Sequence, residues 1–206
     1  MHSRKVILWG VDMQSDFMLP GGKLYVPGAE KLLPNIKKLT DAAREGHIFY
    51  VSHGCYHPPD DPEFATFPPH CIKGTSGSEY VEHATTSKVA RVPNDPAAKI
   101  PQDLFHHQQI LLEKQTLDIF QTHHAHSLVD KLPRDAEFLV FGVVTEYCVR
   151  FAAKGLLERG RSVSLIEDAI ETLNPEESKK THAELKALGA KFLSTEQALD
   201  LMRKAA

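Results

Sequence analysis

The sequence lacks several features that would place it in a special class of protein. Its 206 residues include three cysteines, one tryptophan and only strand-sized apolar runs, of which FLVFGVV (138–144) is typical. An odd and low cysteine count argues against a disulfide framework and favours a reducing, cytoplasmic setting, although a bond between Cys55 and Cys71 stays open. The apolar runs are too short to span a bilayer, so we expect no membrane partner.

The composition also lacks a basic excess. Lysine and arginine number 24 against 27 aspartates and glutamates, and the formal charge is −3, so we expect no nucleic-acid partner. The start of the chain, MHSRKVILWGVD (1–12), has no small-residue cleavage site, so we expect no signal peptide. An apolar fraction of 42% and this length suit a single globular domain over residues 1–206.

Short apolar runs alternate with helical patterns along the chain. Helical spacing of apolar residues in 32–43 and 149–157 predicts two helices, and Asn174-Pro175 and the Ser194/Gln197 capping box begin two more. This alternation predicts parallel βαβ units and a doubly wound α/β sheet. Continuous apolar character predicts strands at KVILWGVD (5–12), HIFYVSHG (47–54), QILLEK (109–114), FLVFGVV (138–144) and SVSLIED (162–168).

One stretch departs from the alternation. Residues 55–108 are long, rich in proline and histidine, and contain a short strand pattern near SKVARVP (87–93). A long insertion inside a compact domain is usually functional.

Reactive side chains follow several of the predicted strands. Asp12 closes the first strand, His53, Cys55 and His57 follow the second, Lys114 closes the third, and Cys148 follows the fourth at the start of a helix. In open α/β sheets, ligands bind beyond the carboxyl ends of the strands. Each residue alone has an ordinary explanation as a cap, a surface charge or a buried thiol, but together they predict one reactive site.

Cys148 has the position of a nucleophile. The free N–H groups and positive dipole end of a helix stabilise a thiolate, and a nearby lysine lowers the thiol pKa further. Asp12 would accept the thiol proton, Lys114 would stabilise the anion, and the thiolate would attack a carbonyl carbon.

Three segments resemble a known family. VDMQSDFMLPGGKLYVPGAE (11–30) and GVVTEYCVR (142–150) resemble the first motif and the nucleophile motif of the isochorismatase-like cysteine hydrolases, and FPPHCIKGTSGSEY (67–80) resembles a segment of their nicotinamidase branch. The resemblance implies a three-layer α/β/α fold with a six-stranded, mostly parallel, doubly wound (Rossmann-like) sheet, and a homo-oligomer.

The resemblance also assigns catalytic roles. It implies an Asp–Lys–Cys triad that maps onto Asp12, Lys114 and Cys148. It implies a cis peptide bond before the nucleophile helix, which would here join Val144 to Thr145 and turn the Thr145 N–H toward an oxyanion, beside the N–H of Cys148.

The nicotinamidase branch carries a metal beside this triad. The resemblance implies a ligand set of His57, Glu63 and His70, and Cys55 stands where the family has an aspartate. Thiolate and imidazole are good zinc ligands and a carboxylate completes such a set, so we expect a divalent metal, zinc before iron or manganese. The alternative is that these histidines are solvated loop residues.

Two phenylalanines are implied as walls of a substrate pocket. Phe17 belongs to the first motif, and Phe120 lies six residues after Lys114, in a segment where Asp118-Ile119-Phe120 departs from the family pattern. The His-rich residues 123–126 have no counterpart and are interpreted as surface.

The function predicted from these residues is metal-assisted hydrolysis of a small, heteroaromatic amide such as nicotinamide, through a thioester on Cys148. Hydrolysis of a carbamoyl or ureido compound is the second hypothesis. A non-catalytic redox protein on the same fold is the third. Hydrolysis of an isochorismate-like ether is least favoured, because it needs neither the thiol nor the metal.

Overall fold

The computed structural model describes residues 6–45 and 48–205. Residues 1–5 lie outside the described residues, and they include Lys5 of a predicted strand and the start of the chain, for which no signal peptide is expected. His47, at the start of the second predicted strand, also lies outside them. No helix in the described ranges is both long and apolar enough to cross a membrane.

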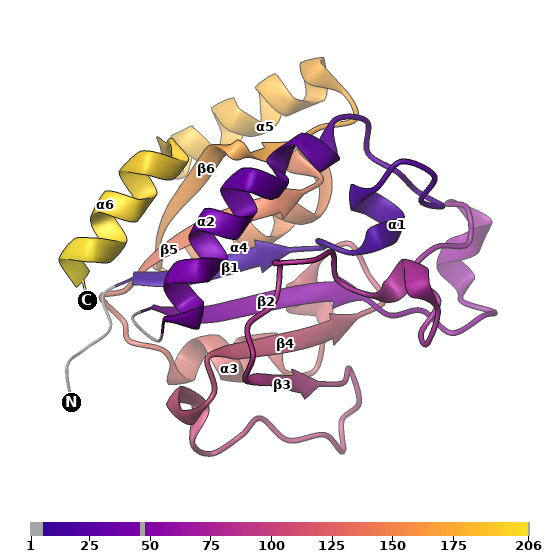
Figure 1. Cartoon of the computed structure of the whole chain (residues 1–206), viewed down its shortest axis with the longest axis horizontal. Helices are drawn as coiled ribbons and strands as arrows, with labels where there is room; N and C mark the ends of the chain where they lie inside the picture. The colour runs from indigo at the N-terminus through magenta and orange to yellow at the C-terminus, as the bar shows by residue number, and fades with distance from the viewer. Residues whose placement is uncertain (1–5, 46–47, 206) are drawn as a thin grey trace.

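Within those ranges, seven strands form one sheet in which every pairing is parallel (Figure 1). The order across the sheet is β3-β4-β2-β1-β5-β6-β7, so the chain winds outward in both directions from β1. The strands are β1 Val6–Val11, β2 Phe49–Cys55, β3 Val89–Val92, β4 Gln109–Lys114, β5 Glu137–Val143, β6 Ser162–Glu171 and β7 Lys191–Leu193.

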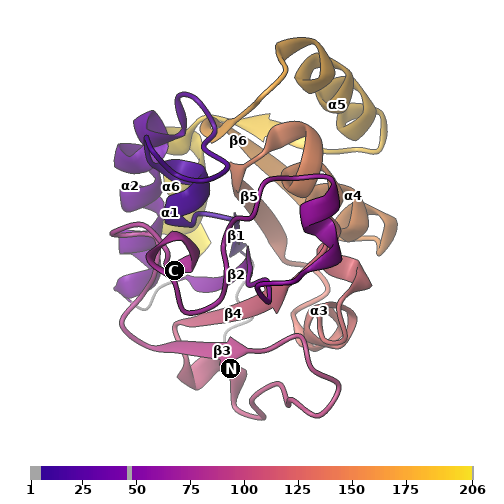
Figure 2. The ribbon, with the colours of Figure 1, turned by 90° about the vertical axis from the view of Figure 1, so that its right-hand side faces the viewer.

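Helices cover both faces of the sheet (Figure 2). On one face α2 and α6 enclose a core with Ile36, Leu39 and Met202, and on the other α3 and α4 enclose a core with Leu128 and Leu156. The helices are α1 Ser15–Met18, α2 Leu33–Arg44, α3 Ala125–Lys131, α4 Arg150–Glu158, α5 Pro175–Ala187 and α6 Thr195–Ala205.

The predicted three-layer α/β/α class is confirmed, with one strand more than expected. The additional strand is β7, whose three residues Lys191–Leu193 are too few to show a periodic pattern. Two predicted helix starts are also confirmed. Asn174 accepts hydrogen bonds from the first N–H groups of α5, and Ser194 and Gln197 bond each other's backbone before α6.

Strand register brings the carboxyl ends of the central strands together. Val11 of β1 pairs with His53 of β2 on one side and with Gly142 of β5 on the other, while Cys55 pairs with Lys114. Gly142 has a φ of +115°, and a Cβ there would overlap the Val11 carbonyl, so only glycine allows this approach. The residues that end these strands therefore share one edge of the sheet.

The long insertion is tied to this edge by Gln14. The Gln14 side chain accepts a hydrogen bond from the Cys55 N–H at 2.7 Å, and it donates to the carbonyls of Cys55 and of Ser78, the latter at 3.0 Å. Because Gln14 follows β1 and Cys55 ends β2, the loop around Ser78 is held at the same edge.

Candidate active site

Three side chains predicted to act together do meet at this edge. The Lys114 ammonium lies 2.9 Å from Oδ2 of Asp12 and 3.6 Å from Sγ of Cys148. All three residues are buried. Asp12 and Lys114 come from the ends of β1 and β4, and Cys148 comes from the turn between β5 and α4, so the sheet register sets their separation.

The charges of this group are opposite and mutually stabilising. Burial raises the pKa of the Asp12 carboxyl, but the Lys114 charge, together with His53 and Cys148, outweighs burial and holds this pKa well below its usual range. Burial likewise opposes the ammonium, but the Asp12 carboxylate, together with Cys148 and Cys55, holds the Lys114 pKa well above its usual range. The two residues therefore form a charged pair across the neutral range.

The thiol of Cys148 behaves differently from expectation. Burial, followed by the negative charge of Asp12, raises its pKa well above the ordinary value, and Lys114 opposes this only in part. The resting group is therefore a neutral thiol beside an ionised carboxylate. The predicted lowering of the Cys148 pKa is not found, because burial and the Asp12 charge outweigh the lysine. A carboxylate beside a thiol is nevertheless placed to take its proton.

Cys148 lies in an irregular turn, Thr145–Val149, that leads directly into α4. The cis peptide bond joins Val143 to Val144. The predicted location, Val144–Thr145, was wrong by one residue, because β5 continues only to Val143 and the chain leaves the sheet there. Thr145 is buried, and its hydroxyl donates to the Glu171 carbonyl at 2.8 Å.

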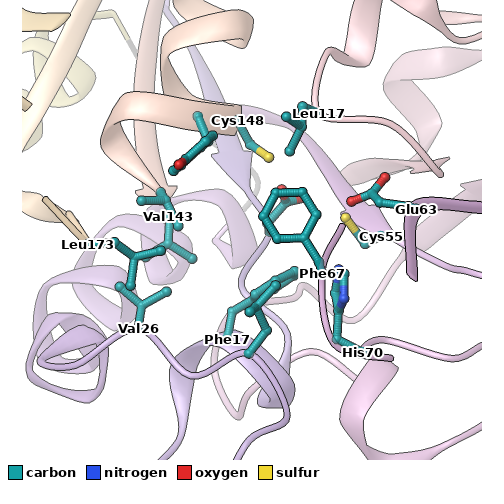
Figure 3. A pocket seen from close by; sticks show the side chains of 14 residues that line it. Phe17, Val26, Cys55, Glu63, Phe67, His70, Leu117, Val143, Cys148 and Leu173 are labelled. Carbon is teal, nitrogen blue, oxygen red and sulfur yellow. The ribbon is translucent and has the colours of Figure 1, made fainter. Parts of the chain in front are cut away.

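A cavity with about 530 Å³ of empty space, its mouth included, opens in front of the thiol. Asp12, Cys148, Cys55, Glu63 and His70 supply its polar atoms (Figure 3). The remaining wall is apolar or aromatic and consists of Phe17, Leu24, Val26, Phe67, Leu117, Val143, Val144, Tyr147 and Leu173.

Beside the thiol, three potential metal ligands converge. One donor atom from each of Cys55, His57 and His70 lies within 4.8 Å of the others, and all three residues are buried. Nδ1 of His57 lies 2.9 Å from the Asp61 carboxylate, and Nδ1 of His70 lies 2.8 Å from the Pro68 carbonyl. These contacts favour the tautomer that leaves Nε2 as a free ligand atom, as is usual for metal-binding histidines.

The donor set fits a divalent metal. Nε2 of His57 is buried without a hydrogen-bond partner among the described residues, which a bound cation would relieve. A thiol with two imidazoles is the donor chemistry of soft to borderline metals. Of the predicted ligands, Cys55, His57 and His70 come together. Glu63 lies outside this tight cluster but lines the cavity next to Cys55, and burial raises its pKa (Figure 3).

Lys114 connects the two thiols. Its ammonium lies 2.9 Å from Sγ of Cys55, closer than to Sγ of Cys148. Burial raises the pKa of the Cys55 thiol to about 12, and the Asp12 charge raises it while Lys114 lowers it. One cation therefore touches the carboxylate, the candidate nucleophile and a candidate metal ligand.

The two predicted pocket phenylalanines have different positions. Phe17 lines the cavity, with its ring centroid 5.3 Å from that of His70. The prediction for Phe120 was wrong. Its ring stacks on Trp9 at 6.3 Å in the core, and the Arg159 guanidinium lies 3.9 Å from its centroid. Asp118 accepts the Phe120 N–H and forms a short turn that directs the ring away from the cavity.

Sequence reasoning missed several wall residues. Phe67 and Leu117 lie next to residues that were identified, so the FPPHC segment and the end of β4 carried some signal. Leu173 lies in the connection between β6 and α5, far along the chain from any motif, and only the fold brings it to the cavity.

His53, which the sequence places among the reactive side chains after the second strand, lies at the same edge of the sheet. It is fully buried at the end of β2, with Nδ1 3.5 Å from Oδ1 of Asp12 and its ring edge against Trp9. Burial holds the His53 pKa below its ordinary value, so the imidazole is neutral beside the carboxylate.

A buried Cys–Lys–Asp group at the carboxyl edge of a doubly wound sheet, facing an enclosed cavity, defines a cysteine hydrolase of the isochorismatase-like type. Residues 6–197 match the Isochorismatase domain, and the chain belongs to that family.

The chain is similar to known proteins over most of its length. It is 28% identical to a nicotinamidase of Saccharomyces cerevisiae, covering 86% of this chain and 94% of that one. The pyrazinamidase of Pyrococcus horikoshii in complex with zinc superposes with a TM-score of 0.71 and 27% identity, covering 92% and 99% of the two chains. N-carbamoylsarcosine amidase of Thermoplasma acidophilum, 23% identical with 93% and 96% covered, shares the fold with a TM-score of 0.68.

Proposed function

We propose that this protein is a cysteine amidohydrolase that cleaves the carboxamide of a small heteroaromatic amide, such as nicotinamide, to the acid and ammonia. The observation that carries the proposal is the Cys148 thiol, flanked by the Asp12–Lys114 pair, facing an apolar cavity beside the Cys55/His57/His70 cluster. A flat, neutral amide suits a wall in which Phe17 and Phe67 offer aromatic faces. Similarity to the yeast nicotinamidase and the archaeal pyrazinamidase supports the same class.

The residues divide the chemistry between them. Asp12 takes the proton of the Cys148 thiol as the sulfur attacks the amide carbon. Lys114 stabilises the negative charge, which moves from the Asp12 carboxylate to the Cys148 sulfur. Asp12 then gives the proton to the departing nitrogen, so ammonia leaves and a thioester remains. Asp12 next activates a water molecule, which releases the acid and restores the thiol. The N–H of Cys148 and an N–H of the preceding pair Val144 and Thr145 are the proposed donors to the oxyanion.

The metal belongs to the same proposal. Cys55, His57 and His70 would hold it, with Glu63 within reach as a further donor, and zinc suits the thiol and imidazoles best. When bound, the ion would supply a Lewis-acidic point that holds a ring nitrogen or a water and so orients the amide.

An ammonia-release assay on nicotinamide and pyrazinamide, with zinc, iron or manganese supplied in turn, tests the proposed substrate. We expect turnover by the native protein and none by Cys148→Ala. If the native protein hydrolyses neither amide faster than Cys148→Ala does, the proposed substrate is wrong.

Elemental analysis beside a Cys55→Asp variant tests the metal. We expect zinc in the native protein and a weaker preference for zinc over manganese in the variant, because a carboxylate is the harder ligand. Equal preference in the two proteins would exclude Cys55 as a ligand.

A carbamoyl or ureido amide is the second candidate. Cys55 and the Asp118-Ile119 segment depart from the nicotinamidase pattern, which favours some change in substrate, and a panel of such amides separates the two. The single domain, the homo-oligomer and the cytoplasmic location stay predictions from the sequence.

A further inference from the structure

The cavity has two unlike sides. Cys55, Glu63 and His70 lie on one side, and Val26 and Leu173 lie on the other, beyond the rings of Phe17 and Phe67 (Figure 3). The first side carries donor atoms, whereas Val26 and Leu173 offer only aliphatic groups. These two side chains therefore act on a ligand through their shape alone.

Leu173 reaches the cavity from a short connection. Residues 172–174, here called the strap, join β6 to α5. Leu173 is 46% exposed although it lines the cavity, so it stands at the mouth with one face toward solvent. Such a residue is held in place by its backbone, because packing covers only part of its side chain.

The strap is fastened by one carboxylate. Glu146 accepts hydrogen bonds from the Thr172 hydroxyl at 2.6 Å, the Leu173 N–H at 3.0 Å and the Asn174 N–H at 2.8 Å. Glu146 is itself only 9% exposed. A shielded carboxylate with three donors is a strong anchor, since hydrogen bonds to a charged acceptor are roughly twice as strong as neutral ones.

The anchor belongs to the turn that carries the nucleophile. Glu146 lies two residues before Cys148, and the neighbouring Thr145 hydroxyl bonds the carbonyl of Glu171, which ends β6. The strap and the thiol are therefore positioned by the same five-residue turn. Any shift of the strap changes the distance between Leu173 and a substrate attached to Cys148.

We propose that Leu173 is a specificity-determining residue of this site and that Glu146 is the positioning residue that holds it there. Together they exclude amides with an alkyl group on the edge that faces away from the Cys55/His57/His70 cluster, and they admit small amides without one. The inference rests on the proposed function for the nature of the substrate. The exclusion itself is a property of the cavity mouth and holds for any reagent that must reach Cys148.

The first test uses substrates. For Leu173→Ala we expect kcat/KM for at least one ring-methyl or ring-ethyl nicotinamide to rise about tenfold relative to nicotinamide, the usual effect of a methylene-sized change in an apolar pocket. Glu146→Ala should shift the same ratio in the same direction, because the strap loses its anchor. Glu146→Gln keeps an acceptor oxygen for the Leu173 and Asn174 N–H groups and should retain the native selectivity. Leu188→Ala removes a leucine of similar exposure, 44%, away from the cavity and is the matched control.

The second test does not require turnover. The rate of Cys148 alkylation by N-(4-alkylphenyl)iodoacetamides, divided by the rate with iodoacetamide, reports the width of the mouth directly. We expect this quotient to rise about tenfold in Leu173→Ala and Glu146→Ala and to stay unchanged in Glu146→Gln and Leu188→Ala. The double variant should show no more than the larger single effect.

The outcomes separate the two ideas. If both alkylation and substrate ratios stay within twofold in Leu173→Ala, or if Glu146→Ala leaves them unchanged, the role of the strap is wrong. If the alkylation quotient rises in Leu173→Ala and Glu146→Ala while the native protein hydrolyses no aromatic amide, the strap does control access to Cys148. In that case only the proposed substrate is wrong.

Discussion

The Lys114 ammonium and the Asp12 carboxylate form an ion pair from which solvent is excluded, with 2.9 Å between Nζ and Oδ2 and side-chain exposures of 0% and 2%. Removing one partner of such a pair leaves a buried charge without compensation. We expect Lys114→Met to lower the free energy of unfolding by about 3–5 kcal/mol, measured by urea denaturation. The double variant Asp12→Asn/Lys114→Met should recover much of that stability without recovering activity. A double variant as unstable as the sum of the single ones would contradict this coupling.

Asp12 also raises the pKa of the thiol that it serves. In Asp12→Asn the negative charge that disfavours the thiolate is gone and Lys114 remains, so the pKa of Cys148 should fall. The pH at which iodoacetamide alkylates Cys148 at half the maximal rate should therefore move downward. Amide hydrolysis should fall by about 10²–10⁴ in the same variant, because the proton acceptor is lost. A midpoint that stays the same or moves upward would show that Asp12 does not control the thiol.

Asp61 fixes the orientation of a candidate metal ligand through its contact with Nδ1 of His57. We expect Asp61→Asn to weaken zinc binding about 10–100-fold, as is usual when the hydrogen-bond partner of a ligating histidine is changed. Equilibrium dialysis of the chelator-treated protein measures this directly. The neighbouring Asp60 is exposed, so Asp60→Asn is the matched control and should bind zinc like the native protein.

The two aromatic residues Phe67 and Phe120 should give opposite results. Phe67 lines the cavity, so Phe67→Leu should raise KM several-fold with little change in the midpoint of unfolding. Phe120 packs on Trp9 and against Gly155, so Phe120→Leu should lower the stability by about 1–3 kcal/mol with KM unchanged. Steady-state kinetics and urea unfolding of the two variants separate the roles. A raised KM in Phe120→Leu would show that Phe120 does line the substrate pocket.

Gly77 is required because a Cβ there would overlap the Asp16 carboxylate. That carboxylate accepts the N–H of Cys71 at 2.7 Å and of Lys23 at 3.0 Å, so it positions the segment that carries His70. Gly77→Ala should reduce both the stability, by about 1–3 kcal/mol, and the zinc affinity. Gly74 has a φ of +86°, and a Cβ there would have no atom within 4 Å. Gly74→Ala therefore reports the backbone strain alone and should leave the zinc affinity unchanged.

The sequence predicted the residues that end buried strands, because a continuous apolar run marks both the strand and the place where it stops. Asp12 and Lys114 were found in this way, and Cys148 was found from its place at the start of the helix after β5; the parallel strand order and this turn bring the three together. Leu173 could not be found, because its position depends on three hydrogen bonds to a residue far away in the chain. The direction of the Phe120 ring and the exact end of β5 depend likewise on local turns that leave no periodic signal.

The tryptophan of β1 has a practical use. Trp9 is the one tryptophan of the chain, it is fully buried, and its ring lies 6.1 Å from that of His53, which in turn faces Asp12. The tryptophan emission therefore comes from one buried residue, which only His53 separates from Asp12. Intrinsic fluorescence can follow unfolding, ligand entry and changes at Asp12 in the native chain, with no label and no competing chromophore of the same kind.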